Sequence, residues 1–375
     1  MAAEQGAVAT DGGVGGSMQR ELGLADCVLL SVGGMVGSAI FVFPGTTGQL
    51  AGPGAIIAWV LAGLGMLTIA LCYTELSLAF PTAGGPAVFP AETFGPWPTV
   101  RAFASYLEGI CYAVGWAFGI TVSALAIARY AGTIVPAANG HTVALALLGI
   151  GLAVAVNLVG VTQTSRTNLV LSAGLLAVLL VFVALGLANA DAANYRPLLP
   201  NGVDSLAAAA AVAMTGFGAG TVIPASAGEV REPSRTIPRA IVLSLAISTL
   251  LYGAIVAAVH GVIPASEFVE GSAVAQAPLG VAAASMGVAV FEGVLLPLAA
   301  IVAIFTTMLV GVMSAGRVLY ALGENGTLPA VVGRVSDRTA VPWVGILLIG
   351  GLSAALAAVP QYFFQLLVVA TVVGT

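Results

Sequence analysis

The sequence predicts an all-α protein that crosses a membrane many times, and three observations support this fold class. The 375 residues are 59% hydrophobic and only 7% charged, whereas about a quarter of the residues of a soluble domain are charged. The mean hydropathy is +1.07. The few charged residues separate uncharged runs of about 20 residues, the length that an α-helix needs to span a bilayer. Because so apolar a chain could not cover its surface with polar groups, a soluble enzyme is excluded.

Charge and cysteine content exclude further classes of protein. The chain carries 16 acidic and 11 basic residues, which give a net charge of −5, and every basic residue is an Arg. A nucleic-acid-binding protein needs an excess of basic residues, and a mechanism that uses a side-chain amine needs Lys. Cys27, Cys72 and Cys111 are isolated, and His141 and His260 lie far apart. These spacings predict no disulfide scaffold, no metal site and no cofactor.

Each predicted helix corresponds to one uncharged run. Residues 27–74 form a run that a Gly- and Pro-rich stretch at 45–54 divides into two helices. The next seven helices are predicted at 109–128, 142–161, 167–190, 205–228, 240–264, 293–316 and 342–359. A tenth apolar segment begins near Gln361 and runs to Thr375. It is shorter than a full span, so we expect the tenth helix to be incomplete.

The distribution of Arg predicts the orientation in the membrane. With the N-terminus inside, only Arg129 and Arg196 fall on the outer side. This bias predicts a multi-pass protein of the plasma membrane with a cytoplasmic N-terminus. The inner arginines are then Arg20, Arg101, Arg166, Arg231, Arg235, Arg239, Arg317, Arg334 and Arg338.

The segments between and before the helices carry further expectations. Residues 1–21 are polar and rich in Gly and Ala, and lack the basic and apolar regions of a signal peptide, so we expect a flexible cytoplasmic tail. The charged run 229–239 is expected to be a solvated inner loop. The loop 265–289 is long enough for a short helix on the outer side, and both His residues are expected at the outer interface.

Two of the predicted helices contain residues that favour a break at mid-span. Gly33, Gly34 and Gly37 interrupt the first helix, and Gly216 and Gly218 lie in a Gly-rich stretch of the sixth. Inside a bilayer, unpaired backbone groups are tolerated only where they line a cavity or are buried in protein. The alternative is close helix packing through small residues four apart, a spacing that both stretches also contain.

The two breaks occupy corresponding positions in two halves of the chain. Helices one and six are each the first of a five-helix unit, 22–190 and 203–375. Because five is odd, the second unit enters from the opposite side, which predicts a five-plus-five inverted repeat. A half-helix that begins at mid-membrane suits a carboxylate, and one that ends there suits an ammonium group or Na⁺. The pair of breaks therefore predicts a secondary transporter for a zwitterion such as an amino acid.

Four motifs, in order along the chain, carry a family resemblance. They are GSAIF at 37–41, ELSLAFPTAGG at 75–85, TGFGAGTVIPASAGEVREPSRTIPRAI at 215–241 and RVLYALGENGTLP at 317–329. The chain resembles the amino acid–polyamine–organocation superfamily of transporters, and within it the amino-acid permeases. The resemblance implies a leucine-transporter-like five-plus-five fold, alternating access, and a central site between helices one, three, six and eight.

The chain departs from this family in three respects. Family members usually have twelve helices, whereas this chain stops within the tenth. Position 218 is Gly, where many relatives have an acidic residue, so substrate preference is not carried over. Some proton-coupled relatives have a Lys on helix five at the cation site, and helix five here, 167–190, has none.

The substrate is expected to bind at the two breaks. The backbone of the first break is predicted to bind a carboxylate, the second break is predicted to supply carbonyl groups and a Phe lid, and a Trp of helix three is predicted to line the pocket. The alternatives are helix packing for the glycines and core packing for the aromatic residues. The predicted substrate-binding residues are Gly37, Ser38, Ala39, Ile40, Thr215, Gly216, Phe217, Gly218 and Trp116.

An ion site and a gate are predicted near these breaks. Thr306 and Thr307 of helix eight, with backbone carbonyls near Gly34, form a set of oxygen ligands for Na⁺. Hydroxyls in membrane helices also often bond back to the carbonyl four residues earlier. Glu75 and Glu108 are predicted to contribute to an inner gate. A solvated helix end is the alternative for the first and an interfacial position for the second.

The sequence thus predicts a transporter and not an enzyme. An intramembrane enzyme needs a Ser/His dyad or paired Asp residues at membrane depth, and the predicted spans contain neither. The expected partners are an amino acid, with or without co-transported H⁺ or Na⁺, and the lipid bilayer. Two alternatives stay open: a polyamine or organocation carrier on the same fold, and a truncated paralogue that does not transport. The oligomeric state is left open.

Overall fold

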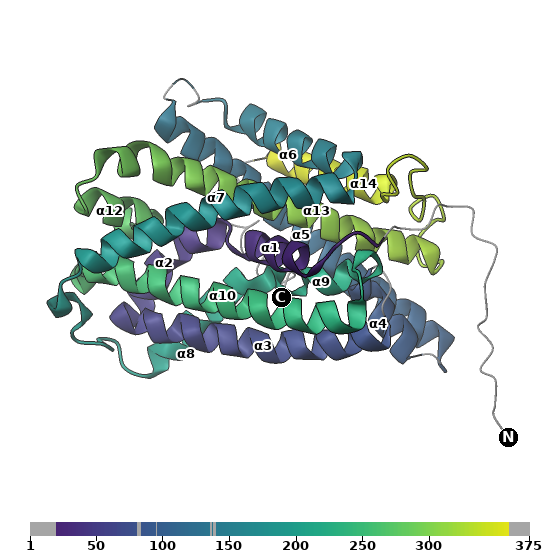
Figure 1. Ribbon diagram of the computed structural model, residues 1–375, viewed down its shortest axis with the longest axis horizontal. Helices are drawn as coiled ribbons and strands as arrows, with labels where there is room; N and C mark the ends of the chain where they lie inside the picture. Colours follow the sequence, from purple (N-terminus) through teal and green to yellow (C-terminus); the bar gives the residue numbers. More distant parts are fainter. Residues whose placement is uncertain (1–19, 81–83, 95, 136, 138–139, 360–375) are drawn as a thin grey trace.

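The computed structural model describes residues 20–359 except 81–83, 95, 136 and 138–139 (Figure 1). Nearly all of the predicted tail 1–21 and the predicted tenth helix at 361–375 lie outside the described residues.

The described residues form helices and no strand; one isolated β-bridge joins Leu22 to Val230. The α-helices are α1 (Leu24–Met35), α2 (Ser38–Ala51), α3 (Ala55–Ala79), α4 (Gly85–Thr93), α5 (Pro98–Ile134), α6 (Thr142–Val159), α7 (Val161–Ala188), α8 (Asp204–Met214), α9 (Val222–Ala225), α10 (Pro233–Val262), α11 (Ala273–Gln276), α12 (Pro278–Ser285), α13 (Leu296–Glu324) and α14 (Trp343–Ala357). Short 3₁₀ segments are η1 (Gly52–Gly54), η3 (Ala192–Tyr195), η4 (Thr215–Thr221), η5 (Ala227–Glu229) and η6 (Ala265–Glu267), and η7 (Phe291–Leu295) is a π-helix.

The prediction of a multi-pass membrane protein is confirmed. Within the described part of the chain, 7 helices are long and apolar enough to span a bilayer, and two shorter apolar helices are Leu24–Met35 and Trp343–Ala357. The long helices lie side by side along the long axis of the molecule (Figure 1). Their outer faces expose large apolar side chains such as Leu250, which is 75% exposed. This exposure is expected of a surface that faces lipid rather than water.

Local sequence explains where the main helices begin and turn. Pro98 and Pro233 stand at the first position of α5 and α10, where the missing N–H of Pro has no helical partner to lose. A single residue, Gly160, separates α6 from α7 and has a φ of 137°, which only Gly adopts readily. The predicted loop helix at 265–289 is also present, as α11 and α12.

The predicted break at 45–54 is much shorter in the structure. Helix α2 continues to Ala51, and only Gly52–Gly54 separate it from α3. Gly52 has a φ of 58° and ends α2. Gly45 and Gly48 instead pack closely against Ala275 and Phe268, so these glycines allow a close approach of the loop 265–289 rather than a turn.

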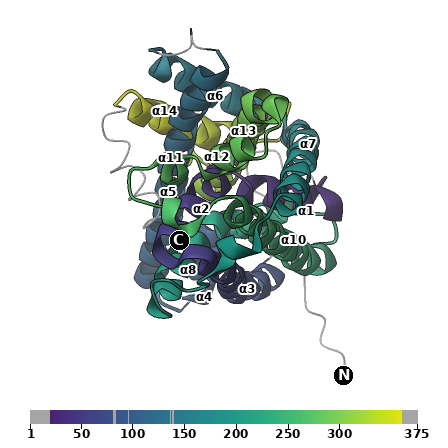
Figure 2. The same ribbon diagram turned by 90° about the vertical axis from the view of Figure 1, so that its left-hand side faces the viewer.

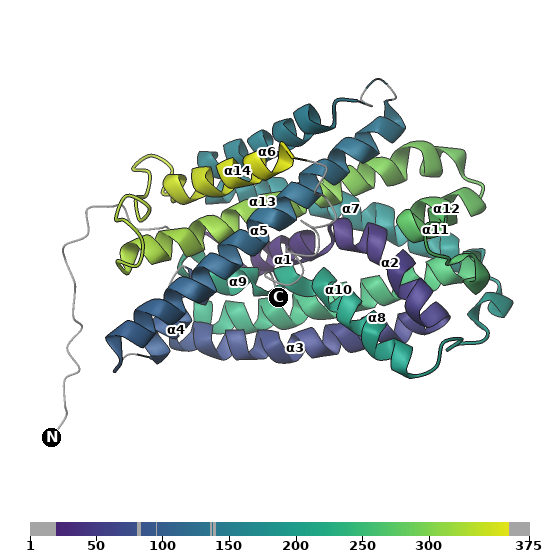
Figure 3. The same ribbon diagram turned by 180° about the vertical axis from the view of Figure 1, so that it is seen from behind.

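Helix α2 lies in the middle of the bundle, and α1 lies beside α7 and α10 (Figure 2). Helix α1 packs on α7, α10 and α13, whereas α2 packs on α8 and on the short helices α11 and α12. Helix α5 crosses the molecule diagonally and packs along α13 (Figure 3). The chain between α1 and α2 is therefore held at the centre of the bundle.

Candidate functional site

The first helical segment is interrupted between α1 and α2. Val36 and Gly37 lie outside both helices, and the Gly37 N–H donates to the carbonyl of Met35 at 2.8 Å. Helix α2 then begins at Ser38, so the N–H groups of residues 38–40 have no acceptor within the helix. Gly37 and Ile40 are buried and Ala39 is half-buried. A buried helix start thus presents backbone donors at the centre of the bundle.

A second irregular segment lies opposite the first. Helix α8 ends at Met214 and continues as the 3₁₀ segment η4 before α9 begins. A Cβ built on Gly216 would lie 3.4 Å from the Cβ of Ala39 and 3.1 Å from the Trp59 ring. The Gly216 carbonyl accepts a 3.2 Å hydrogen bond from the Tyr252 hydroxyl. The two irregular segments therefore meet at Ala39 and Gly216.

The side chains of η4 differ in their surroundings. Phe217 is fully buried, and its ring lies 5.0 Å from the Tyr252 ring and 6.1 Å from the Trp59 ring. This is the position of a core aromatic residue, and its lid role stays a prediction. The Thr215 hydroxyl donates to the Val212 carbonyl at 2.7 Å, so its hydrogen bond is made within the preceding helix. Gly218 borders open space, because a Cβ added there would have no neighbour within 4 Å.

Several oxygen atoms converge where α13 meets the end of α1. The Thr306 hydroxyl lies 2.9 Å from the Gly33 carbonyl, and the Thr307 hydroxyl lies 2.9 Å from the Gly34 carbonyl. Both hydroxyls are also within reach of the Ala303 carbonyl, at 2.8 and 3.2 Å. Each hydroxyl has one proton and can donate to only one carbonyl at a time. The cluster therefore holds more acceptors than donors, a composition that suits a hard cation.

Helix α7 adds polar atoms on the far side of Gly33. The Asn168 amide donates to the Leu29 carbonyl at 2.9 Å. The Asn168 Oδ1 and the Ser172 Oγ are buried against Gly33 and have no hydrogen-bond partner among the described residues. Buried polar atoms without a partner are rare in folded proteins and point to a bound ligand, ion or water. Sequence reasoning missed these two residues, although both are polar residues within an apolar helix.

Trp116 lies beside the same region, on α5. Its ring packs directly on Gly311, one turn along α13 from Thr307. The Tyr112 ring stands 6.4 Å away, and the Tyr112 hydroxyl forms a 2.6 Å hydrogen bond with Ser314. The half-buried Trp116 thus packs α5 against α13 close to the predicted ion site.

A buried ion pair joins the segment after α9 to α13, and it corrects the prediction of a solvated loop at 229–239. Glu229 and Arg317 are each 1% exposed, and their charged groups are 2.8 Å apart. Arg231, Glu232 and Arg235 are exposed, as predicted. The reason is that η5 turns the chain back toward α13, whose Arg lies in apolar surroundings. Burial raises the pKa of the Glu229 carboxyl, and the guanidinium beside it opposes that shift.

The start of α1 is tied to this ion pair through the backbone. The N–H groups of Glu21 and Leu22 both donate to the Glu229 carbonyl at 2.9 Å, and the Arg231 N–H donates to the Leu22 carbonyl at 2.8 Å. We call these bonds together with the Glu229–Arg317 ion pair the inner latch. It connects the ends of α1, α9 and α13 that lie at the arginine-rich end of the bundle.

Other predicted polar residues lie elsewhere. Glu75 and Glu108 are exposed, and Glu108 accepts a 3.1 Å hydrogen bond from the Tyr73 hydroxyl. A gating role for either residue stays a prediction. His141 is exposed, but His260 is fully buried and stacks on Phe268 with ring centres 4.3 Å apart, so its predicted interfacial position is wrong. Phe268, in the loop that follows α10, covers this ring.

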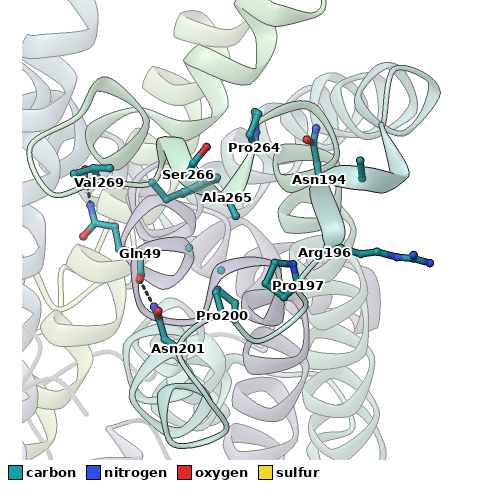
Figure 4. Close-up of a pocket in the computed structure, with 14 residues that line it drawn as sticks. Gln49, Asn194, Arg196, Pro197, Pro200, Asn201, Pro264, Ala265, Ser266 and Val269 are labelled. Carbon is teal, nitrogen blue, oxygen red and sulfur yellow. Dashed lines mark hydrogen bonds between the residues drawn. The ribbon is translucent and has the colours of Figure 1, made fainter.

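A pocket of about 500 Å³ opens at the opposite end of the bundle, between the end of α2 and the loops around η3 and η6 (Figure 4). The Gln49 amide donates to the Val269 carbonyl at 3.3 Å, and the Asn201 amide donates to the Gln49 carbonyl at 3.1 Å. The Arg196 guanidinium points away from the pocket (Figure 4). These amides hold the loops together.

Comparison with known proteins identifies the family and several relatives of this chain. The family described as amino acid permease matches residues 22–373. The Arabidopsis thaliana protein "Cationic amino acid transporter 9, chloroplastic" is 30% identical over 341 residues, which cover 86% of this chain and 58% of that protein. The Bacillus subtilis protein "Branched-chain amino acid permease BcaP" is 29% identical over 356 residues, which cover 91% of this chain and 75% of that protein.

A third relative, the "Methylthioribose transporter" of Bacillus subtilis, is 26% identical over 358 residues, 91% of this chain and 75% of that protein. The chain therefore spans between 58% and 75% of the length of these relatives. The family match covers most of the chain and includes all four motifs of the resemblance. This multi-pass membrane protein belongs to the amino acid permease family.

Proposed function

We propose that this protein is a secondary transporter that moves amino acids across the plasma membrane by alternating access. The observation that carries the proposal is the meeting of two irregular regions, the junction 36–37 with the start of α2 and the segment η4, at the centre of an apolar bundle. Irregular backbone inside a membrane protein is tolerated only where it is buried in protein or lines a cavity. Relatives named as amino-acid permeases support the substrate class.

The proposed substrate site uses the backbone on both segments. The free N–H groups at the start of α2, on residues 38–40, would bind the carboxylate. A helix N-terminus stabilises a negative charge by about 0.3–1 kcal/mol, and by more when the site is buried. Carbonyl groups of residues 215–218 would accept from the ammonium group. The open space beside Gly218 would take the substrate side chain, and Trp116 would close the site from α5.

The proposed coupling ion is Na⁺, bound by the oxygen cluster of Gly34, Thr306 and Thr307. The excess of acceptors in that cluster supports the proposal, as do the unpartnered oxygens of Asn168 and Ser172 next to Gly33. In the arrangement seen here the two hydroxyls donate to the α1 carbonyls. A cation would replace those protons, and the hydroxyls would turn to present their lone pairs.

The proposed architecture is a five-plus-five inverted repeat, 22–190 and 203–375, with broken helices one and six. The proposed orientation places the arginine-rich end in the cytoplasm, because Arg is enriched on the inner side of membrane proteins. The inner latch then holds the cytoplasmic end of α1 against η5 and α13. Inward opening requires these bonds to break, so the latch is part of the proposed inner gate.

Uptake into proteoliposomes tests the proposal. The wild type, Gly37→Leu and Gly216→Leu variants would be given a labelled amino-acid mixture under imposed Na⁺ and H⁺ gradients. Gly37→Leu should abolish uptake, because even a Cβ there collides with the Thr307 side chain. Gly151→Leu is the matched control, since Gly151 is exposed on α6 and a Cβ there meets nothing within 4 Å.

The gradient that drives uptake identifies the coupling ion. Uptake driven by Na⁺ supports the oxygen cluster as the ion site, whereas uptake driven only by H⁺ excludes it. The proposal is wrong if folded wild-type protein takes up no amino acid under any gradient. It is also wrong if the Gly37→Leu variant transports as well as the control.

A further inference from the structure

A second pocket lies at the arginine-rich end, where α7 and α14 begin (Figure 1). Its volume is about 330 Å³, and its lining is mostly polar. Two guanidinium groups from separate parts of the chain line it, one from the second turn of α7 and one from the loop before α14. The polar lining residues are Arg166, Arg338, Thr162, Gln163, Thr339 and Glu21.

The two guanidinium groups are available to a ligand. Both Arg166 and Arg338 are exposed, and neither forms an ion pair or side-chain hydrogen bond with another described residue. Two other arginines of this end are occupied: Arg101 faces Glu92 at 3.9 Å, and Arg317 is buried with its Glu partner. One carboxylate, that of Glu21, also lines the pocket, so its ionised side chains carry one net positive charge.

The pocket borders an exposed, largely apolar face of α7. Gln163, Arg166 and Val170 stand at positions i, i+3 and i+7 of α7 and share one exposed face. The same face continues to Leu180, and Val170 and Leu180 are 67% and 60% exposed. Val159, 62% exposed, lines the pocket itself. In a multi-pass membrane protein this apolar face meets acyl chains, so Arg166 stands where that face ends and the polar lipid headgroups begin.

We infer that this pocket binds the headgroup phosphate of an acidic phospholipid between Arg166 and Arg338. Guanidinium groups bind phosphate oxygens through paired, charge-assisted hydrogen bonds. The start of α7 adds the positive end of a helix dipole. The acyl chains would lie along the apolar face of α7, which a free phosphate could not use. The proposed orientation decides only which leaflet holds this lipid, and it assigns the lipid to the cytoplasmic leaflet.

The bound lipid would act on the start of helix one. Glu21 lines the pocket and its backbone N–H belongs to the inner latch. Helix α7 also holds α1 directly, because the Ser165 hydroxyl lies 3.3 Å from a carboxylate oxygen of Asp26. A headgroup phosphate between Arg166 and Arg338 would therefore repel the ionised Glu21 side chain, so lipid binding would weaken the latched arrangement of residues 21 and 22.

Lipid binding to the purified full chain in detergent tests this inference without any transport assay. Native mass spectrometry would compare phosphatidylglycerol with phosphatidylcholine of the same acyl chains. The Arg166→Gln/Arg338→Gln variant should bind phosphatidylglycerol at least about tenfold more weakly than the wild type. The matched control is Arg235→Gln/Arg239→Gln, which removes two exposed arginines from the same end but outside the pocket.

A gain-of-affinity variant keeps the test decisive if the double variant folds poorly. Glu21→Gln removes the carboxylate from the pocket and should tighten phosphatidylglycerol binding several-fold. Equal affinity of the pocket and control variants, or equal binding of phosphatidylcholine, would overturn the inference. Displacement of phosphatidylglycerol by millimolar inorganic phosphate would make free phosphate the ligand and overturn the lipid assignment.

Discussion

At the scale of single residues, the best-defined polar interaction is the Glu229–Arg317 ion pair. Both side chains are almost fully removed from solvent, and the Arg317 Nη1 also donates to the Met313 carbonyl at 2.7 Å. Sequence reasoning assigned Glu229 to a solvated loop, because a charged run after an apolar segment usually marks a helix end. Its partner lies 88 positions away, and no local pattern connects the two. The signal in the sequence for a buried ion pair was the position of Arg317 inside the apolar stretch 309–322.

Removal of one partner of this pair should be far more costly than removal of both. Arg317→Met leaves a buried carboxylate without a counter-charge, and Glu229→Gln leaves a buried guanidinium; each should cost about 3–5 kcal/mol. The Glu229→Gln/Arg317→Met double variant should recover much of that loss. Thermal unfolding of the four proteins in detergent gives the double-mutant cycle. Strictly additive losses would mean that the two groups do not interact.

The oxygen cluster gives a second prediction at this scale. Thr306→Val and Thr307→Val keep the side-chain shape but remove one hydroxyl each from the predicted Na⁺ site. If Na⁺ binds there, the Na⁺ concentration for half-maximal uptake should rise about tenfold or more, which corresponds to 1.4 kcal/mol. Thr121→Val is the control, since Thr121 is as buried as Thr306 but bonds to carbonyls of α5 and α14. If both variants keep the Na⁺ dependence of the wild type, Na⁺ does not bind at these hydroxyls.

At the scale of elements, the positions of the helices were predictable and their junctions were not. Uncharged runs located every described spanning segment, because hydrophobic length is a property of the local sequence. The predicted turn at 45–54 shrank to Gly52–Gly54, because Gly45 and Gly48 serve contacts with the distant loop 265–289. Composition does not distinguish a packing glycine from a turn glycine. The junction 36–37 falls within the Gly-rich stretch of the first predicted helix, whereas the contact between Ala39 and Gly216 needed the packed structure.

The irregular segment η4 provides a prediction about substrate size. Gly218 has open space around its Cα, so Gly218→Leu should fold normally with an unchanged thermal midpoint. If that space takes the substrate side chain, the variant should lose uptake of large apolar amino acids about tenfold while it retains Gly and Ala. Gly119→Leu on α5 is the control, since it also meets nothing within 4 Å. If uptake of small and large amino acids falls equally, the substrate side chain does not occupy the space beside Gly218.

At the scale of the whole molecule, the inner latch fixes one end of the bundle while the other end carries an open pocket. The start of α1 is bonded to residues 229–231, and the chain around η3 and η6 leaves a pocket of about 500 Å³. The latch was not predictable from sequence, because it joins residues 21–22 to residues 229–231, which lie far along the chain.

A reversible cross-link of the latch tests whether its opening is needed for transport. Leu22 and Val230 form the isolated bridge and are buried, so cysteines at these positions would be close enough for a disulfide. The variant would be made after Cys27, Cys72 and Cys111 are replaced by Ala, because they are free thiols. Oxidation should hold the end of α1 against η5 and reduce amino-acid uptake below about a tenth of the reduced protein's rate. Dithiothreitol should restore it, and each single-cysteine variant should be insensitive to oxidation. Since a disulfide adds only a local constraint, full uptake by the oxidised protein would mean that α1 and η5 never separate during transport, and the inner latch would then be a fixed part of the fold.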